Sequence, residues 1–156
     1  MAVDIEKQLI SISNTMSKMQ GLYRKIAIKN GISNVNVQIL YILYFNKSVT
    51  QKQIHNLCEI PKQTINNIIK ELKDKNYITL IADDIDKRQK YIVFTDEGKK
   101  YCESILEPFF NINEKVIKRV GKNLTKELAE KMSILCKALE LEIEILEITK
   151  KWEENE

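Results

Sequence analysis

The chain has 156 residues, of which 44% are apolar and 30% are charged, a balance that is typical of a folded globular protein and excludes an intrinsically disordered one. There are 25 Lys and Arg against 22 Asp and Glu, so the net charge of +3 does not by itself indicate a nucleic-acid partner. No apolar run approaches membrane-spanning length. Residues 1–7 lack the pattern of a signal peptide, so we expect a cytoplasmic protein with no membrane partner.

The N-terminal segment predicts one long helix with an apolar seam. Its apolar residues are spaced alternately by four and three positions: Ile5, Leu9, Ile12, Met16, Met19, Tyr23 and Ile26. Such a sustained seven-residue repeat requires a partner along the helix, and we expect part of that partner to be a second copy of the chain. The alternative is an ordinary amphipathic helix packed on its own domain.

Three shorter helices are expected next. Gly31 breaks the first helix, Ser33 has the position of an N-cap, and the following apolar pattern ends near Asn46. A third helix begins at Thr50, because residues 50–53 (Thr-Gln-Lys-Gln) fit the reciprocal capping box. The pair Ile60-Pro61 should end that helix and start the fourth, since proline suits a first helical position.

The fourth helix, residues 61–75, has two different faces. Its inward face is apolar: Ile65, Ile68, Ile69 and Leu72. Its outward face combines amides with lysines: Lys62, Gln63, Asn66, Asn67, Lys70 and Lys73. Side chains of these types suit base edges and phosphates.

A β-hairpin should follow this helix. Asn76 is placed to stop it in a left-handed conformation. Residues 77–81 and 91–94 then have the composition of strands, and residues 82–90 form a charged tip between them. Val49 is a candidate for a short third strand.

The rest of the chain predicts two helices. Thr95 should cap the first, which runs to Gly121, and Pro108 should kink or interrupt it. The second begins near Thr125 and carries an apolar stripe: Leu128, Met132, Leu135, Leu139, Ile143 and Leu146. A second stripe joins it: Leu141, Ile145, Ile148 and Trp152. Because a surface helix needs one apolar face, two faces indicate contact with its own domain and with another chain, that is, a homodimer.

The hairpin gives the most specific indication of a family. Asp86-Lys87-Arg88, a hydrophobic strand ending at Phe94-Thr95, and then Gly98 resemble the wing of MarR-family transcription regulators. The resemblance is carried by residues 50–98. It implies a mostly α fold with a small β-hairpin wing (α+β), a winged helix-turn-helix with long N- and C-terminal dimerisation helices. The single MarR-like domain would span residues 1–156, with the winged lobe at about 33–98 and dimerisation helices at about 3–30 and 99–153.

The resemblance also implies residues that bind double-stranded DNA. The fourth helix would enter the major groove and the wing arginine the adjacent minor groove. The implied contacts on the helix are Lys62, Gln63, Thr64, Asn66 and Asn67, with Lys70 near phosphate, and those on the wing are Lys87, Arg88 and Lys90. Asp86 would orient the guanidinium of Arg88. Because Asn and Gln pair bidentately with adenine, we expect an A·T-rich site. Binding as a homodimer would make that site an inverted repeat.

The resemblance further implies a homodimeric repressor that a small ligand releases from DNA. The implied ligand crevice lies between the dimerisation helices and the winged lobe, and its candidate lining is Tyr23, Tyr41, Tyr44 and Phe110. The alternative is that these aromatic residues belong to the core. For the protein as a whole, the alternative is a winged-helix interaction module that acts on another regulator without binding an operator.

The sequence offers little for catalysis or metal binding. The single histidine, His55, is expected at the surface, and no phosphate loop, nucleophile elbow or metalloprotease motif is present. His55 and the cysteines, Cys58, Cys102 and Cys136, lack the close pairs of a zinc site. The cysteines lie at apolar helical positions, so we expect reduced, buried thiols. We therefore predict no enzyme activity, no cofactor and no metal.

Overall fold

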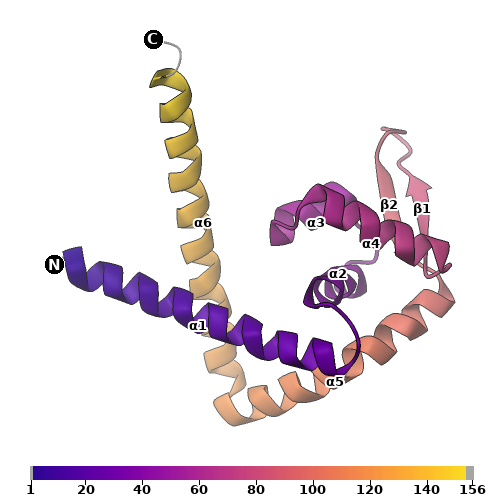
Figure 1. Cartoon of the computed structure of the whole chain (residues 1–156), viewed down its shortest axis with the longest axis horizontal. Coiled ribbons are helices and arrows are strands. Elements are labelled where there is room, and N and C mark those ends of the chain that lie inside the picture. The colour runs from indigo at the N-terminus through magenta and orange to yellow at the C-terminus, as the bar shows by residue number, and fades with distance from the viewer. Residues whose placement is uncertain (1, 154–156) are drawn as a thin grey trace. The chain divides into compact units, whose positions relative to one another are not determined.

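Figure 1 shows a computed structural model of the chain, which describes the backbone of residues 2–153 and the side chains of residues 4–148. Its elements in chain order are α1 (Ala2–Lys29), α2 (Asn34–Phe45), α3 (Gln51–Cys58), α4 (Lys62–Asp74), β1 (Ile78–Ala82), β2 (Lys90–Phe94), α5 (Asp96–Val120) and α6 (Lys122–Glu153). The predicted fold class, mostly α with a β-hairpin wing, is confirmed. The chain divides into two compact units, residues 1–110 and 111–156. Within the described residues, no helix is both long and apolar enough to cross a membrane.

Local caps set the helix boundaries of the first unit, as predicted. α1 ends before Gly31, whose φ of 67° suits glycine. The backbone N–H of Asn36 donates to Ser33 Oγ at 3.1 Å and caps α2. At α3, the N–H of Gln53 donates to Thr50 Oγ1 at 3.2 Å, and the N–H of Thr50 donates to Gln53 Oε1 at 2.8 Å. The capping box is therefore confirmed.

The turn between α3 and α4 differs from the prediction. α3 ends at Cys58, and Glu59 adopts a left-handed conformation with φ 50°. Pro61 is the N-cap of α4 and not its first helical residue. His55, expected at the surface, is half-buried, and its Nδ1–H donates to the carbonyl of Ile60 at 2.8 Å. Ile60 is buried in the core, so the turn must bend back toward the protein, and His55 stabilises that bend.

One hydrophobic core joins the elements of the first unit. Side chains with less than 2% of their surface exposed include Ile39 and Leu40 of α2, Ile54 of α3, Ile65 of α4, and Leu106 and Phe109 of α5. Burial of each such side chain contributes about 1.5–3 kcal/mol. The predicted inward face of α4 is confirmed, since Ile65, Ile69 and Leu72 are buried and Ile68 is half-buried. This core holds α4 with its polar face outward.

The hairpin begins one residue later than predicted, for a reason found at the end of α4. The N–H of Tyr77 donates to the carbonyl of Leu72 at 2.9 Å, and the N–H of Asn76 to that of Lys73 at 2.9 Å. With Asn76 at φ 58°, these two bonds form a Schellman motif. Because the N–H of Tyr77 is part of this motif, β1 begins at the next residue. β1 then pairs with β2 in antiparallel register, with Leu80 opposite Ile92. The predicted third strand is a single bridge between Val49 and Ile92.

The start of α5 is hydrogen-bonded to the base of the wing. Thr95 caps the helix as predicted, because its Oγ1 accepts the N–H of Gly98 at 2.9 Å. The same hydroxyl donates to the carbonyl of Asn76 at 2.8 Å, and the N–H of Thr95 donates to that of Tyr77 at 3.0 Å. The ring of Tyr77 stacks on that of Tyr101, with centroids 4.2 Å apart. α4, the wing and α5 therefore share one junction.

α5 and α6 differ in part from the prediction. α5 continues through Pro108 as one helix, so the proline does not interrupt it. Leu106 and Phe109 are fully buried beside this proline, and their packing outweighs the lost backbone hydrogen bond. α6 begins at Lys122 and not near Thr125, whose hydroxyl already donates to the carbonyl of Gly121 at 2.9 Å. The left-handed Gly121, with φ 90°, makes the break between the helices short.

The apolar stripes of α1 and α6 are largely exposed in the single chain. Ile5, Leu9 and Met19 of the α1 seam are exposed, whereas Tyr23 and Ile26 are half-buried against the core of the first unit. On α6 both predicted stripes have exposed members: Leu128, Leu139, Leu141, Ile143, Ile145, Leu146 and Ile148. Trp152 was predicted for the second stripe, but its side chain lies outside the described residues.

Candidate nucleic-acid interface

α4 presents most of the predicted polar residues on one exposed face. Its exposed members are Lys62, Gln63, Asn66, Asn67 and Lys70. Thr64 is half-buried. α4 contacts β1, so this face and the wing belong to one lobe within the first unit (Figure 1).

A pair of amides on α4 is joined by a hydrogen bond. Gln63 Nε2 donates to Asn67 Oδ1 at 3.0 Å, one turn along the helix. Each amide keeps hydrogen-bonding capacity for an outside partner, since an NH₂ group has two donors and a carbonyl oxygen two lone pairs. Because the hydrogen bond already holds both side chains in one arrangement, binding of a partner would cost less side-chain conformational entropy. Spacing of i and i+4 in the sequence is the signal that could have predicted this pair.

The tip of the wing is organised by Asp83. Its Oδ1 accepts the backbone N–H of Ile85 at 2.8 Å and that of Asp86 at 2.9 Å. Two backbone bonds close the tip, from the N–H of Asp83 to the carbonyl of Gln89 and from the N–H of Gln89 to that of Asp86. This role of Asp83 was not predicted, although aspartate in a turn commonly accepts backbone N–H groups two or three residues later, as in an Asx turn.

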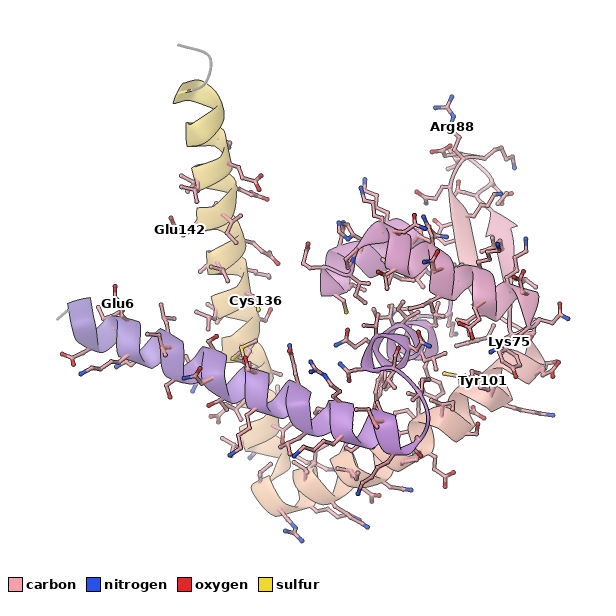
Figure 2. The ribbon with its side chains drawn as sticks, in the orientation of Figure 1. Glu6, Lys75, Arg88, Tyr101, Cys136 and Glu142 are labelled. Atoms are coloured by element: carbon pink, nitrogen blue, oxygen red, sulfur yellow. The ribbon has the colours of Figure 1, made fainter. Side chains whose placement is uncertain are left out.

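The wing carries its predicted cations on the exposed tip. Lys87, Arg88 and Lys90 are all exposed. Figure 2 shows the Arg88 side chain extending outward from the end of the hairpin. Asp86 was expected to orient the guanidinium of Arg88, but its Oδ1 accepts the backbone N–H of Arg88 at 3.0 Å. Asp86 therefore sets the direction in which Arg88 leaves the turn, and does so through the main chain.

The hydrogen bonds to Asp83 predict a pH dependence of the tip. The N–H groups of Asp86 and Ile85, and then the hydroxyl of Tyr91, hold the pKa of the Asp83 carboxyl below its usual range. A depressed carboxyl pKa stabilises the fold above the unfolded value of about 3.9. This contribution is lost as the pH falls through the folded pKa. In an NMR titration, Asp83 should have a lower midpoint than in a peptide of residues 80–92.

The same titration has an internal control. Tyr91→Phe removes one donor to the carboxylate and should move the Asp83 midpoint partly back toward that of the peptide. An Asp83 midpoint in the folded protein at or above the peptide value would contradict the hydrogen-bonding pattern.

The cysteines differ from one another, which corrects the expectation of three buried thiols. Cys102 is completely buried, and Cys58 and Cys136 are exposed. Burial raises the pKa of the Cys102 thiol to about 12, and its Sγ lies 3.6 Å from the carbonyl oxygen of Leu40. Desolvation also raises the pKa of Cys58. Among the described residues, no three His, Cys, Asp or Glu side chains gather as metal ligands.

Cysteine alkylation should reflect this difference. Since the thiolate is the reactive form, iodoacetamide at pH 8 should leave Cys102 unmodified in the native protein and should modify it after denaturation. The exposed Cys136 should be modified in both states. Mass spectrometry of peptides would measure this, and rapid native labelling of Cys102 would contradict its burial.

The four aromatic residues predicted to line a ligand crevice all lie partly buried against the core of the first unit. Phe110 contacts Tyr41 and Tyr44, with ring centroids 5.6 and 5.4 Å apart. Tyr23 lies on α1, which packs against α2. Phe45 was not among the predicted residues, but it stacks on Tyr41 with ring centroids 6.1 Å apart and is 69% exposed. Its position at the end of the apolar run of α2 could have indicated that it belongs to this aromatic group.

The lobe built from α2, α3, α4 and the wing is the part of the chain that comparison with known families identifies. A model of the MarR family matches residues 30–89. Residues 30–89 are therefore similar to the MarR family. The match includes α4 and the tip of the wing with Arg88 and ends one residue before Lys90, so it supports the predicted family on most of the candidate interface.

Solved structures of MarR-family and related regulators share the fold of this chain. NMB1585, a MarR family regulator from Neisseria meningitidis, is 24% identical, with a TM-score of 0.76 over 87% of this chain and 96% of that one. MepR of S. aureus, solved in a complex with DNA, is 19% identical, with a TM-score of 0.62 over 83% and 95%. NadR, solved with 4-hydroxyphenylacetate, is 18% identical, with a TM-score of 0.71 over 81% and 89%. At these identities the likeness establishes the fold alone. No curated protein matches the chain in sequence.

Proposed function

We propose that this MarR-family chain is a cytoplasmic, homodimeric transcriptional repressor that binds an A·T-rich inverted repeat in double-stranded DNA. The observation that carries the proposal is the joint presentation of an amide face and an extended arginine by one lobe. α4 exposes Gln63, Asn66 and Asn67, and the wing exposes Arg88. Amides suit adenine edges in the major groove, and arginine suits the negative potential of a narrow A·T minor groove.

The charge of the interface supports binding through a few placed contacts. Residues 61–90 contain seven Lys and Arg against five Asp and Glu, a net charge of about +2. The structure reduces the repulsion expected from the acids, because Asp83 and Asp86 accept backbone N–H groups of the tip. Lys62 and Lys70 lie exposed at either end of the amide face, where phosphates would meet them.

The proposed dimer is supported by the exposed apolar stripes of α1 and α6. Exposed apolar surface that is rimmed by polar residues is typical of protein–protein interfaces. Two lobes related by a two-fold axis would present two α4 helices to successive major grooves, about 34 Å apart. An inverted repeat follows from this symmetry. The proposal also keeps a single MarR-like domain over residues 1–156, with dimerisation helices at about 3–30 and 99–153.

Release by a small ligand is part of the proposal. Tyr23, Tyr41, Tyr44 and Phe110 are candidate contacts, and NadR offers one solved example of a related fold with a bound aromatic acid. A ligand would release DNA only by binding the DNA-incompetent shape of the dimer more tightly than the competent one. 4-Hydroxyphenylacetate is therefore a reasonable first compound to test.

Selection of bound sequences from random DNA tests the proposal directly. We expect enrichment of an A·T-rich inverted repeat with half-sites about one helical turn apart. Affinity for the selected DNA should fall steeply with salt. Repeating the selection with candidate ligands tests release. Enrichment of no motif would overturn the proposal and would favour a protein-interaction module.

A further inference from the structure

The most exposed apolar side chain at the tip of the wing has no role in the interface as described so far. Ile85 is 98% exposed, the largest exposed fraction among the large apolar residues whose side chains are described. It lies between Asp84 and Asp86, three residues from Arg88. Isolated apolar residues on a surface are common, so exposure alone assigns no function. The geometry and the charges of the tip distinguish Ile85 from such residues.

The tip holds Ile85 in a defined position. The N–H of Ile85 donates to Asp83 Oδ1 at 2.8 Å, within the turn that the Asp83–Gln89 and Gln89–Asp86 backbone bonds close. Presentation by a preformed turn lowers the ordering cost of any contact that Ile85 makes. An isoleucine side chain adds little cost of its own, because its branched Cβ restricts χ1.

The acidic side chains around Ile85 are hydrogen-bonded or ion-paired. The carboxylates of Asp83 and Asp86 accept backbone N–H groups, and Asp84 lies 3.8 Å from Lys87 Nζ. The side chains of Asp84 and Lys87 are themselves exposed, and their charges offset each other as an ion pair. Ile85 is exposed beside them, and the guanidinium of Arg88 extends outward from the same tip (Figure 2). This combination matches a minor groove of A·T pairs, which has negative potential at its floor and deoxyribose along its walls.

On the basis of the proposed function, we propose that Ile85 is a second minor-groove contact of the wing. Its side chain packs against the deoxyribose walls of the A·T-rich segment that Arg88 enters. The minor groove is about 6 Å wide, and apolar side chains including isoleucine are used there by other DNA-binding proteins. A G·C pair at this place would put the guanine 2-amino group on the groove floor, so Ile85 also contributes to the preference for A·T.

The test compares Ile85→Ala with the wild-type chain on the selected operator, by fluorescence anisotropy. Removal of a partly buried apolar contact should weaken binding about tenfold. The slope of log affinity against log salt should stay at the wild-type value, because no charge is lost. Arg88→Ala, by contrast, should lower that slope by about one. Thermal stability of Ile85→Ala should equal that of the wild type, since the side chain is already exposed in the folded protein.

Two controls complete the design. Ile81→Ala removes the same side chain from β1 of the same hairpin and should leave the affinity within about twofold. Replacing A·T by inosine·cytosine at the wing position retains an A·T-like minor groove and should keep both wild-type affinity and the effect of Ile85→Ala. Replacement by G·C should weaken wild-type binding and should reduce the loss of affinity that Ile85→Ala causes.

The outcomes separate this inference from the proposed function. If the wild-type chain binds no DNA sequence, the proposed function fails and the role of Ile85 fails with it. If the wild-type chain binds and Ile85→Ala binds within twofold of it, the inference alone is overturned. A loss that comes with a lower salt slope or lower thermal stability would also overturn it, because neither change follows from an apolar contact.

Discussion

Gly98→Ala is expected to lower the free energy of unfolding by about 3 kcal/mol or more, a severe loss for a small domain. A Cβ at this position would lie 1.7 Å from the carbonyl oxygen of Tyr77 and 2.5 Å from its carbonyl carbon. Both atoms belong to the main chain, so no side-chain rotation relieves the overlap. The junction would have to open, because the same Tyr77 carbonyl accepts the N–H of Thr95.

Chemical denaturation followed by circular dichroism would measure this loss. Gly21→Ala is the matched control, since a Cβ at Gly21 in α1 meets no atom within 4 Å. Alanine is the better helix former, so this variant should be equally stable or more stable by about 0.5–1 kcal/mol. Equal stabilities of Gly98→Ala and the wild type would show that α5 does not approach the wing base this closely.

Arg88→Ala is expected to weaken operator binding about 10- to 100-fold, because a charge-assisted contact contributes about 1.5–3 kcal/mol. The affinity should fall on every A·T-rich sequence, and the salt slope should decrease by about one. Folding should be unaffected, since Arg88 is exposed and contributes its backbone N–H to the tip. Gel-shift titrations at several salt concentrations would measure both quantities.

Two variants make the Arg88 result specific. Arg119→Ala removes the same charge from an exposed position in the second unit and should leave the affinity and the salt slope nearly unchanged. Asn66→Ala should relax the base preference at one operator position by about 1–3 kcal/mol without changing the slope. Binding that is insensitive to Arg88→Ala and Asn66→Ala would contradict the proposed interface.

Several features of the interface followed from neighbouring residues in the sequence. Thr50 and Gln53 predicted the capping box, and the alternation of Ile65, Ile69 and Leu72 predicted which side of α4 is buried. Asn76 predicted the helix stop. These features depend on residues within about four positions of one another, so composition and spacing are sufficient to predict them.

Other features could not be predicted in this way. The ring of Tyr77 stacks on that of Tyr101, because the antiparallel strands of the wing return the chain to the end of α4. Pro108 lies inside a continuous helix, because the core buries Leu106 and Phe109 beside it. In each case a contact between distant segments or a particular loop conformation outweighed the local preference of the residue.

The amino-acid sequence by itself determined the order of helices and strands, the polar face of α4 and the cationic wing, since these are properties of periodicity and local capping. Only the tertiary structure decided how these parts meet. It placed Gly98 beneath the main chain of Tyr77, and it brought the hydroxyl of Thr95 to the carbonyl of Asn76. The physical reason is that steric exclusion and hydrogen-bond direction depend on three-dimensional position, which spacing along the chain does not specify.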